Sequence, residues 1–271
     1  MTSIKYPISV FIIAKNEEDR IVRSIESVLD WVDEVIVIDS GSTDKTVELS
    51  EAAGARVLYN AWPGYGAQKS FGEKQCRNEW ILNIDADEVV SDTLAQEMRA
   101  LFQNGHQEGI YGYRLSICTV LPSYVTKKNW AYPRMSPVRL YDLRYGKYST
   151  HWVHDRVVLD EGYVSRNIFK GYIDHYTIQD LSSLIYKFNG YSDEQVLTIF
   201  PAEGCVSNFL FNIRLIFEFF VNFIKYYFLK RLFLYGMYGF ILAMIHAFAR
   251  FQRIAKVYEK GLREKEVKEQ V

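Results

Sequence analysis

The sequence has few of the residues that build disulfide or metal-thiolate frameworks. Its 271 residues include three cysteines, which are widely spaced and form no C-x-x-C pair: Cys76, Cys118 and Cys205. This spacing argues against a disulfide scaffold and against a cysteine-rich zinc site, and it predicts reduced thiols in a cytosolic setting.

Two N-terminal features are also missing. The apolar run from Ile8 to Ala14 is short, no small-residue cleavage site follows it, and the chain turns acidic at Glu17. We therefore expect no secretory signal peptide. Lys15-Asn16-Glu17 follows the first expected strand, where a nucleotidyltransferase of similar topology would carry a Gly-rich loop. Because this loop is missing, the sequence argues against a nucleotidyltransferase.

Apolar residues are plentiful, and charge is unevenly distributed. Hydrophobic residues make up 49% of the chain and aromatic residues 15%, which excludes a disordered chain and favours membrane association. Residues 205–271 contain 11 Lys and Arg against five Asp and Glu, so about six positive charges are in excess there, and about seven negative charges are in excess in residues 1–204. The basic residues lie among apolar ones, and we expect no nucleic-acid partner.

The first half of the chain alternates predicted strands and helices. Short apolar runs at 7–14, 34–39, 56–60 and 80–84 predict buried strands, and helical spacing separates them, with Ser42 or Thr43 as a helix cap. This order predicts an α/β fold with a parallel sheet covered on both faces. Ligands bind beyond the carboxyl ends of such strands, so Asp39 and Asp85 should face one crevice.

The second half predicts a smaller sheet that builds the substrate side. Residues 110–117, 138–143 and 152–159 are rich in Tyr, Val and Ile and predict strands, with a turn between the first two. Helical spacing returns from 181 to 200, and the chain is strongly apolar after Cys205.

The stretch ILNIDADE, at 81–88, places Asp85, Asp87 and Glu88 at the end of a predicted buried strand. Carboxylates this close repel one another unless a positive charge sits among them. Paired carboxylate oxygens suit Mg²⁺ or Mn²⁺, and such an ion would neutralise charge on a leaving diphosphate. The alternative is that the acidic residues only favour the start of a helix near Ser91.

Four segments follow one another along the chain: ISVFIIAKNEE, EVIVIDSGSTDKT, GYGAQKS and NEWILNIDADE. Together, in this order, they resemble glycosyltransferase family 2, the inverting enzymes with a nucleotide-diphospho-sugar donor. The chain is more narrowly similar to the bacterial WaaE/KdtX-type branch that adds sugars to the lipopolysaccharide core. The resemblance is strong over residues 7–105 and looser over 130–180. It implies a GT-A type, Rossmann-like fold and a UDP-sugar donor.

The resemblance also implies roles for residues of the donor side. The nucleoside would be held by Ala14, Asn16, Glu17 and Asp39, of which Asp39 could accept the N3–H of uracil. Many family members have two aspartates where this chain has Asp39-Ser40. Asp44 is interpreted as a helix-start residue. Gln68 and Lys69 are expected in a loop over the nucleotide, with solvated surface as the alternative, and Asp85 and Asp87 form the D-x-D pair, Asp87 being the metal ligand.

On the acceptor side the resemblance implies a carboxylate base. HWVHDRVVLD offers His154-Asp155 where the related branch has His-Glu, so Asp155 is the predicted general base, with a salt bridge to Arg156 as the structural alternative. His175 is a candidate metal or diphosphate ligand. Arg134 and Arg139 are candidate diphosphate contacts that flank a turn, with ordinary surface positions as the alternative. His151 and His154 would point to opposite faces of a strand, which argues against a metal site there.

The C-terminal region predicts membrane contact through residues 205–260. In residues 209–231, Arg214, Glu218, Asn222 and Lys225 fall on one narrow stripe of an otherwise apolar helix, as in helices that lie in a membrane interface. Residues 232–249 contain no Asp, Glu, Lys or Arg and approach the length of a spanning helix. We favour a monotopic amphipathic hairpin, with a single span as runner-up. Packing within the protein or on a second copy of the chain is the soluble alternative.

The predicted protein is a membrane-associated, metal-dependent inverting glycosyltransferase that acts on a lipid-anchored glycan. Its expected parts are a catalytic domain at 1–204, divided into a nucleotide-sugar half at 1–108 and an acceptor half at 109–204, and a membrane-associating helical region at 205–271. The expected location is the cytoplasmic face of a bacterial inner membrane. Two other hypotheses remain: transfer to a polyprenyl phosphate, which needs no base because its nucleophile is already anionic, and a non-catalytic adaptor on a degenerate fold.

Overall fold

The computed structural model describes residues 4–105, 109–125, 135–149, 156–198 and 208–269. The chain forms two compact units. The first contains Met1–Thr119 and Arg134–Tyr176, and the second contains Val120–Pro133 and Thr177–Val271. Each unit is built around its own buried apolar side chains.

The first unit is built on a seven-stranded sheet with the order β11-β6-β8-β4-β1-β2-β3. The strands are β1 (Tyr6–Ala14), β2 (Val32–Asp39), β3 (Arg56–Tyr59), β4 (Trp80–Asp85), β6 (Ile110–Arg114), β8 (Val138–Asp142) and β11 (Val164–Arg166). β1 pairs in parallel with β2 and β4, and β2 pairs in parallel with β3, which confirms the four predicted parallel strands. β8 runs antiparallel to both β4 and β6.

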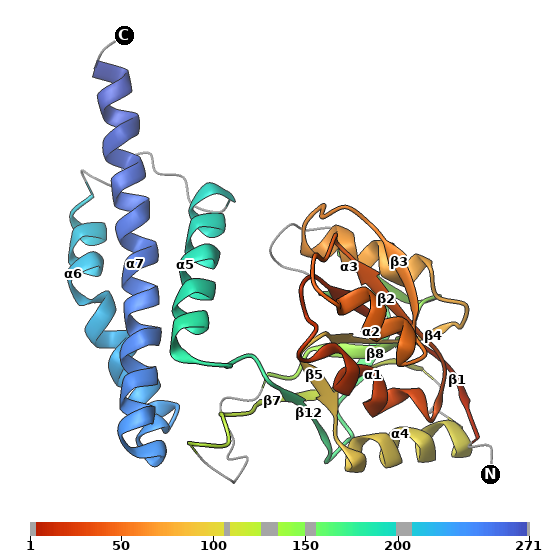
Figure 1. Cartoon of the computed structure of the whole chain (residues 1–271). Helices are drawn as coiled ribbons and strands as arrows, with labels where there is room; N and C mark the ends of the chain where they lie inside the picture. The colour runs from red at the N-terminus through yellow and green to blue at the C-terminus, as the bar shows by residue number, and fades with distance from the viewer. Residues whose placement is uncertain (1–3, 106–108, 126–134, 150–155, 199–207, 270–271) are drawn as a thin grey trace. The chain divides into compact units, whose positions relative to one another are not determined.

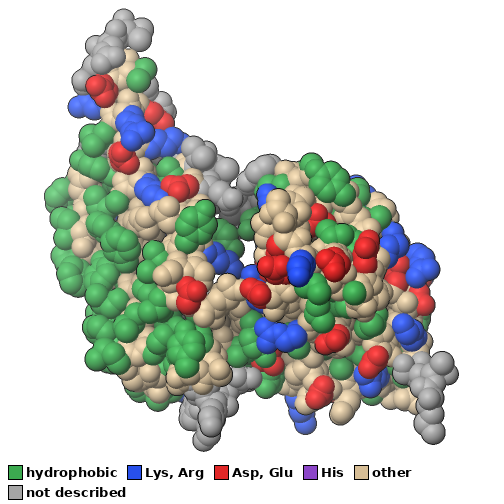
Figure 2. Space-filling model, viewed as in Figure 1, with side chains coloured by type: hydrophobic (Ala, Val, Ile, Leu, Met, Phe, Trp, Pro, Cys, Tyr) green, Lys and Arg blue, Asp and Glu red, His purple; other side chains and the backbone are tan. Residues whose placement is uncertain are grey.

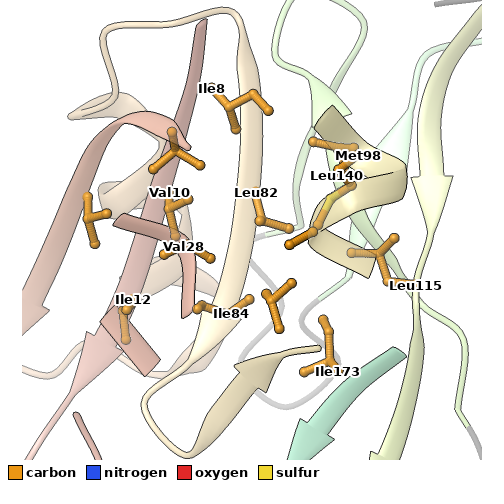
Figure 3. Close-up of a cluster of buried hydrophobic side chains, with 14 of the residues drawn as sticks. Ile8, Val10, Ile12, Val28, Leu82, Ile84, Met98, Leu115, Leu140 and Ile173 are labelled. Atoms are coloured by element: carbon orange, nitrogen blue, oxygen red, sulfur yellow. The ribbon is translucent and has the colours of Figure 1, made fainter. Parts of the chain in front are cut away.

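Helices cover both faces of this sheet, as the sequence predicts. The helices are α1 (Ile21–Leu29), α2 (Thr46–Ala52), α3 (Tyr65–Lys74) and α4 (Asp92–Asn104) (Figure 1). On one face Val28 of α1 and Met98 of α4 pack with strand residues such as Val10 and Leu82 (Figure 3). On the other face Phe71 of α3 packs on Phe11 and its neighbours. Burial of these side chains is the main stabilising term of the unit.

The predicted small sheet at 110–117, 138–143 and 152–159 is wrong in its membership. β6 and β8 extend the main sheet, while β7 (Ser116–Thr119) joins β5 (Glu88–Val90) and β12 (Tyr172–His175) in a separate three-stranded sheet. The chain changes sheets at the buried residue Leu115, between β6 and β7. β9 (Gly146–Tyr148) and β10 (Val157–Leu159) form an antiparallel hairpin. Apolar spacing marks strands, but it does not say which strand lies beside which.

Gly171, just before β12, is required by a close approach to α4. A Cβ atom there would lie 2.3 Å from the backbone nitrogen of Leu94 and 2.5 Å from its Cα, and neither atom can move without moving the helix. We expect Gly171→Ala to lower the free energy of unfolding by about 1–3 kcal/mol. Gly190→Ala, in open space on a helix, should instead raise it by up to about 1 kcal/mol. Urea unfolding measures both, and equal effects would contradict the packing argument.

Glu34 of β2 holds the start of β4 in place. Its carboxylate accepts hydrogen bonds from Ser9 Oγ at 2.6 Å and Arg77 Nε at 3.0 Å, as well as from the Arg77 backbone N–H, and it pairs with Arg56. Burial raises the pKa of Glu34, but these bonds outweigh it and the net pKa lies below the ordinary value of 4.5.

Because the folded-state pKa is depressed, the stability that ionised Glu34 contributes is complete above pH 4.5 and is lost as the pH falls through the folded pKa. We expect Glu34→Gln to cost about 2 kcal/mol at neutral pH and to flatten the stability profile below pH 4.5. Chemical unfolding at several pH values measures this. An unchanged slope in the acid range would contradict the assignment.

The second unit is helical. It contains α5 (Leu181–Thr198), α6 (Phe209–Ile224), the π-helical turn η1 (Lys225–Leu229), the short 3₁₀ helix η2 (Leu232–Tyr235) and the long α7 (Gly236–Glu269). Its core contains Leu184 of α5, Leu232 of η2 and Leu242 of α7. α6 is connected to α7 through η1 and η2, and Arg231 and Gly236 have positive φ angles in this connection.

The compact units divide the chain earlier than the boundary expected at 204/205. α5 belongs to the helical unit, because Lys256 of α7 bonds to the Asn189 side chain at 2.8 Å and to Ser192 Oγ at 2.7 Å. Within the described residues, one helical stretch, Leu232–Val267, is long and apolar enough to cross a membrane. Length and composition alone support that statement.

Candidate active site

Three strands of the main sheet end at the same edge. In the strand register Ala14 of β1 lies beside Asp39 of β2, and Ile13 lies beside Asp85 of β4. The carboxyl ends of these parallel strands therefore bring Asp39 and Asp85 to the two sides of β1. The prediction that both residues lie at one edge of the sheet is confirmed.

Asp85 lies between two cations. One carboxylate oxygen is 3.1 Å from Lys69 Nζ of α3, and the other is 3.1 Å from the Arg139 guanidinium of β8. Burial raises the pKa of Asp85, but Arg139 and Lys69 outweigh it and hold this pKa well below its usual range. Asp85 is therefore a carboxylate at every physiological pH.

A polar network lies behind Asp85. Arg139 also pairs with buried Glu88 at 3.1 Å, and its second terminal nitrogen donates to Asn83 Oδ1. The Tyr148 hydroxyl donates to the same oxygen at 2.6 Å. Burial raises the pKa of Glu88, and Arg139 opposes this shift. Two carboxylates thus share one guanidinium, and neutral side chains fix that guanidinium in place.

Asp87 is the buried member of the D-x-D pair and contacts a histidine. His175 Nε2 lies 3.2 Å from Asp87 Oδ1, and Arg20 approaches the other oxygen at 3.6 Å. The small sheet makes this contact possible, since His175 of β12 is paired in register with Glu88 of β5. Burial lowers the pKa of His175, but the bond to Asp87 and the nearby carboxylates outweigh it, and the net pKa is raised.

The predicted metal pair, Asp87 and His175, is brought together. Across the ranges that the structure describes, no group of three or more His, Cys, Asp or Glu side chains is arranged to hold a metal ion. The Asp87 carboxylate is a ligand that suits Mn²⁺ or Mg²⁺, and the neutral imidazole of His175 would add a nitrogen ligand, with several positions left for other ligands. The residues fit a metal with two protein ligands.

The predicted nucleoside residues form one connected loop region. Asp39 is buried and accepts hydrogen bonds from the N–H groups of Gly41 at 2.8 Å and Ser42 at 3.0 Å. Asn16, which has a φ of 56°, donates its backbone N–H to Ser42 Oγ and accepts from the Thr43 N–H at 2.8 Å. The loops after β1 and β2 are therefore fixed to each other.

Neighbouring bonds complete this region. The Glu17 N–H donates to Thr46 Oγ1, and the Ser40 N–H donates to the carbonyl of Ala14 at 3.0 Å. Asp44 accepts from the Thr46 N–H at 3.0 Å just before α2, which confirms its interpretation as a helix-start residue. The expected cap by Ser42 or Thr43 is wrong, because the Ser42 side chain is taken up by Asp39 and Asn16.

Two predictions of local structure need correction. Gln68 and Lys69 lie on helix α3 rather than in a loop, and both are buried. The Gln68 side chain donates to Ser40 Oγ at 3.0 Å and accepts from the Asn60 side chain, so it fixes the position of the loop after β2. The helix starts immediately after Gly64, whose φ of 101° is one that glycine adopts readily.

Arg139 is the second correction. It lies inside strand β8 and is buried, so it neither flanks a turn nor occupies an ordinary surface position, and its contact with the diphosphate stays a prediction. Its guanidinium is occupied by Asp85, Glu88 and Asn83. Arg134 and Asp155, together with His151 and His154, lie outside the described residues, so their predicted roles stay predictions.

Sequence reasoning missed the side chains that support Asp85 and Asp87. Asn83 and Tyr148 orient Arg139, Glu73 accepts from the Tyr141 hydroxyl at 2.8 Å and from the Tyr148 N–H at 3.0 Å, and Arg20 approaches Asp87. One signal was present: Asn83 is a polar residue inside the otherwise apolar strand WILNID. A buried polar residue in a strand needs partners, and those partners mark a site.

Comparisons with known proteins agree with the geometry. The family model described as glycosyl transferase family 2 matches residues 9–161. An uncharacterized glycosyltransferase of Rickettsia typhi is 37% identical over 266 residues, covering 96% of this chain and 89% of the relative. The lipopolysaccharide core biosynthesis glycosyltransferase LpsC of Rhizobium meliloti is 34% identical over 267 residues, covering 94% and 93%.

Among solved structures, the chain is similar to glucosyl-3-phosphoglycerate synthase from Mycobacterium tuberculosis in complex with Mg²⁺ and UDP. The identity is 29%, the TM-score is 0.36, and the match covers 41% of this chain and 44% of that one. The family model spans more than half of this chain, and relatives named as glycosyltransferases align along nearly all of it. This chain is therefore a member of glycosyltransferase family 2.

Proposed function

We propose that the protein is a metal-dependent inverting glycosyltransferase that moves a sugar from a UDP-sugar to a lipid-anchored glycan such as the lipopolysaccharide core. The observation that carries the proposal is the geometry of the site. Asp39 ends β2 and Asp85 ends β4, the two strands that flank β1, so both lie at one edge of the sheet. Asp87, two residues after Asp85, contacts His175. Family membership makes the chemistry a sugar transfer. The relative LpsC supports the choice of acceptor.

The donor would lie across this edge. Asp39 and the joined loops that contain Ala14, Asn16 and Glu17 offer polar groups for the nucleoside. Asp87 and His175 would hold Mn²⁺ or Mg²⁺, which supplies positive charge to the leaving diphosphate when it is bound. Lys69, which lies against Asp85, is placed to donate to a phosphate oxygen of the same diphosphate.

Asp155 is the proposed general base, and its neighbours support that role. Ser149 and Arg156, on either side of the segment that contains it, are joined by a backbone hydrogen bond of 2.9 Å at the end of the β9–β10 hairpin. Next to Ser149, Tyr148 bonds to Asn83, and its ring lies 5.5 Å from Lys69 Nζ. Tyr148, two residues before the segment that contains Asp155, therefore contacts residues that surround Asp85.

The helical unit is proposed to lie on a membrane surface. Hydrophobic side chains gather over α6 and the first half of α7 in Figure 2. Many large ones are exposed by half or more of their surface: Phe209, Leu210, Ile216, Phe217, Phe220, Val221, Ile224, Phe228, Leu229, Leu234, Met237 and Phe248. A soluble monomer rarely exposes an apolar patch of this extent.

We place the enzyme at the cytoplasmic face of a bacterial inner membrane as a monotopic protein. The first unit is the proposed catalytic part, and residues 205–260 supply the membrane contact. A single span through Leu232–Val267 and a homo-oligomer through the C-terminal helices are the alternatives. A membrane-bound enzyme meets a lipid-anchored acceptor in the plane of the bilayer, which explains why a sugar transferase would carry this unit.

The test combines donor binding with transfer. Calorimetry of detergent-solubilised protein with UDP, UDP-glucose and UDP-galactose should show binding in Mn²⁺ that EDTA removes. Transfer to lipopolysaccharide core and to polyprenyl phosphate is then compared for the wild type and Asp155→Asn. We expect transfer to core glycan that Asp155→Asn reduces by about 10²–10⁴-fold. Transfer to polyprenyl phosphate that survives Asp155→Asn would replace the acceptor, and a lack of all nucleotide binding would support the adaptor hypothesis.

A further inference from the structure

α6 and α7 place charged residues toward the seam between them, although much of their outer surface is apolar. The two helices run antiparallel and in contact: the ring of Tyr226, next to α6, stacks on His246 of α7 at 4.4 Å, and Phe211 lies 6.5 Å from Tyr258. Between these two pairs lie Arg214 and Glu218 on α6 and Arg250 and Arg253 on α7. We call these four residues the seam cluster.

The seam cluster carries an excess of positive charge. Glu218, which is largely buried, pairs with Arg214 at 3.1 Å. Burial lowers the pKa of Arg253, Arg250 and Arg214 lower it further, and Glu218 opposes them, so all four side chains lie within electrostatic reach of one another. Three of these four charged side chains are therefore guanidinium groups, and Glu218 is the carboxylate among them. Arg253 also donates to Gln195 of α5 at 3.2 Å, which fixes its position.

Exposed apolar side chains border this cluster on both helices. Phe217 and Phe220 of α6 are 55% and 60% exposed, and Phe248 of α7 is 52% exposed. In a helix pair that meets only water, the apolar faces would meet in the seam and the charged residues would face outward. Here half-buried arginines lie next to apolar surface that no part of the described chain covers. A ligand that is anionic at one end and apolar at the other fits both features.

We propose that the seam cluster binds the phosphate of an anionic membrane lipid, whose acyl chains lie along the exposed apolar side chains of α6 and α7. The inference rests on the proposed membrane association and adds a headgroup preference to it. Guanidinium groups suit phosphate oxygens because their planar forks donate two parallel hydrogen bonds. A bound phosphate would also bring negative charge to the three arginines of the seam cluster.

A second copy of the chain is a poorer occupant of this surface. In a symmetric dimer the same patch lies on both subunits, so the three arginines of one copy would approach those of the other. Like charges in a partly desolvated interface disfavour such a contact. A lipid phosphate brings the opposite charge to the same place.

The test uses the full-length protein and vesicle flotation. Vesicles of phosphatidylcholine alone are compared with vesicles that also contain phosphatidylglycerol, for the wild type, Arg250→Gln/Arg253→Gln and the matched control Lys260→Gln/Arg263→Gln. The control removes the same charge from α7 outside the seam cluster. We expect the wild type to prefer phosphatidylglycerol and the seam variant to lose about 30-fold in that preference, with little change on phosphatidylcholine, while the control changes much less.

Each other outcome has a distinct meaning. Equal losses in both double variants would overturn the seam site in favour of diffuse charge attraction. Equal wild-type binding to both vesicles would overturn the headgroup inference and leave membrane association standing. Binding to neither vesicle would overturn both. The far-UV circular dichroism and thermal unfolding of each variant, compared with the wild type, show whether a loss in flotation comes from misfolding of the helical unit.

Discussion

We expect the substitution Asp87→Asn to lower kcat/KM for sugar transfer by about 10³-fold. Asp87 contacts His175 at 3.2 Å and is the carboxylate best placed to hold a divalent ion. A metal contributes several kcal/mol of charge stabilisation in the transition state, and about 4 kcal/mol corresponds to about 10³-fold in rate. Asn keeps the size of the side chain and one oxygen, so packing is preserved while the charge is lost.

The matched control is Asp92→Asn, which removes an exposed carboxylate from the first turn of α4. It should leave kcat/KM within about twofold, since no contact joins it to the site. Calorimetry with UDP and Mn²⁺ separates binding from chemistry: Asp87→Asn should also weaken metal-dependent binding. Full activity and full Mn²⁺ dependence in Asp87→Asn would overturn the assignment of Asp87 as a metal ligand.

Replacing Arg139 by Met should cost about 3–5 kcal/mol of folding free energy. The guanidinium is buried and lies 3.1 Å from both Asp85 and Glu88, so its removal leaves two carboxylates close together with Lys69 as the remaining paired cation. Removing one partner of a buried ion pair is costly because the other charge stays desolvated. Urea unfolding of the variant measures the loss directly.

A second substitution makes this result specific. Glu88→Gln removes one of the two carboxylates, so Arg139→Met/Glu88→Gln should recover part of the stability that Arg139→Met loses. If Arg139 instead contacts the diphosphate, as the sequence predicts, Arg139→Met should weaken UDP binding and lower the free energy of unfolding by less than about 1 kcal/mol. That outcome would contradict its role as a buried partner of Asp85 and Glu88.

The family resemblance and the four parallel strands were predicted from the sequence. Runs such as PISVFIIA and EVIVID are apolar enough to mark buried strands, and polar or acidic residues close or follow each run. Because parallel strands end at one edge, the approach of Asp39 and Asp85 followed from the sequence alone. His175 was predicted as a metal or diphosphate ligand only through the family resemblance.

Contacts between distant segments were beyond the reach of local patterns. Periodicity shows which face of an element is apolar, but the pairing of β12 with β5, which brings His175 to Asp87, depends on register between residues far apart in the chain. Arg139 was predicted beside a turn because its guanidinium suits diphosphate oxygens. Its burial depends instead on three acceptors, Asn83 and Asp85 of β4 and Glu88 of β5.

The sequence by itself determined the α/β class, the four parallel strands, the acidic edge and the apolar C-terminal helices, because each rests on residue chemistry within one segment. Only the tertiary structure decided that Lys69 and Arg139 flank Asp85, and that α5 belongs with α7. It also decided that Arg214 and Glu218 of α6 lie within electrostatic reach of Arg253 on α7. The physical reason is that a charge is stabilised by whichever opposite charge packing brings near, and packing joins residues that the sequence keeps apart.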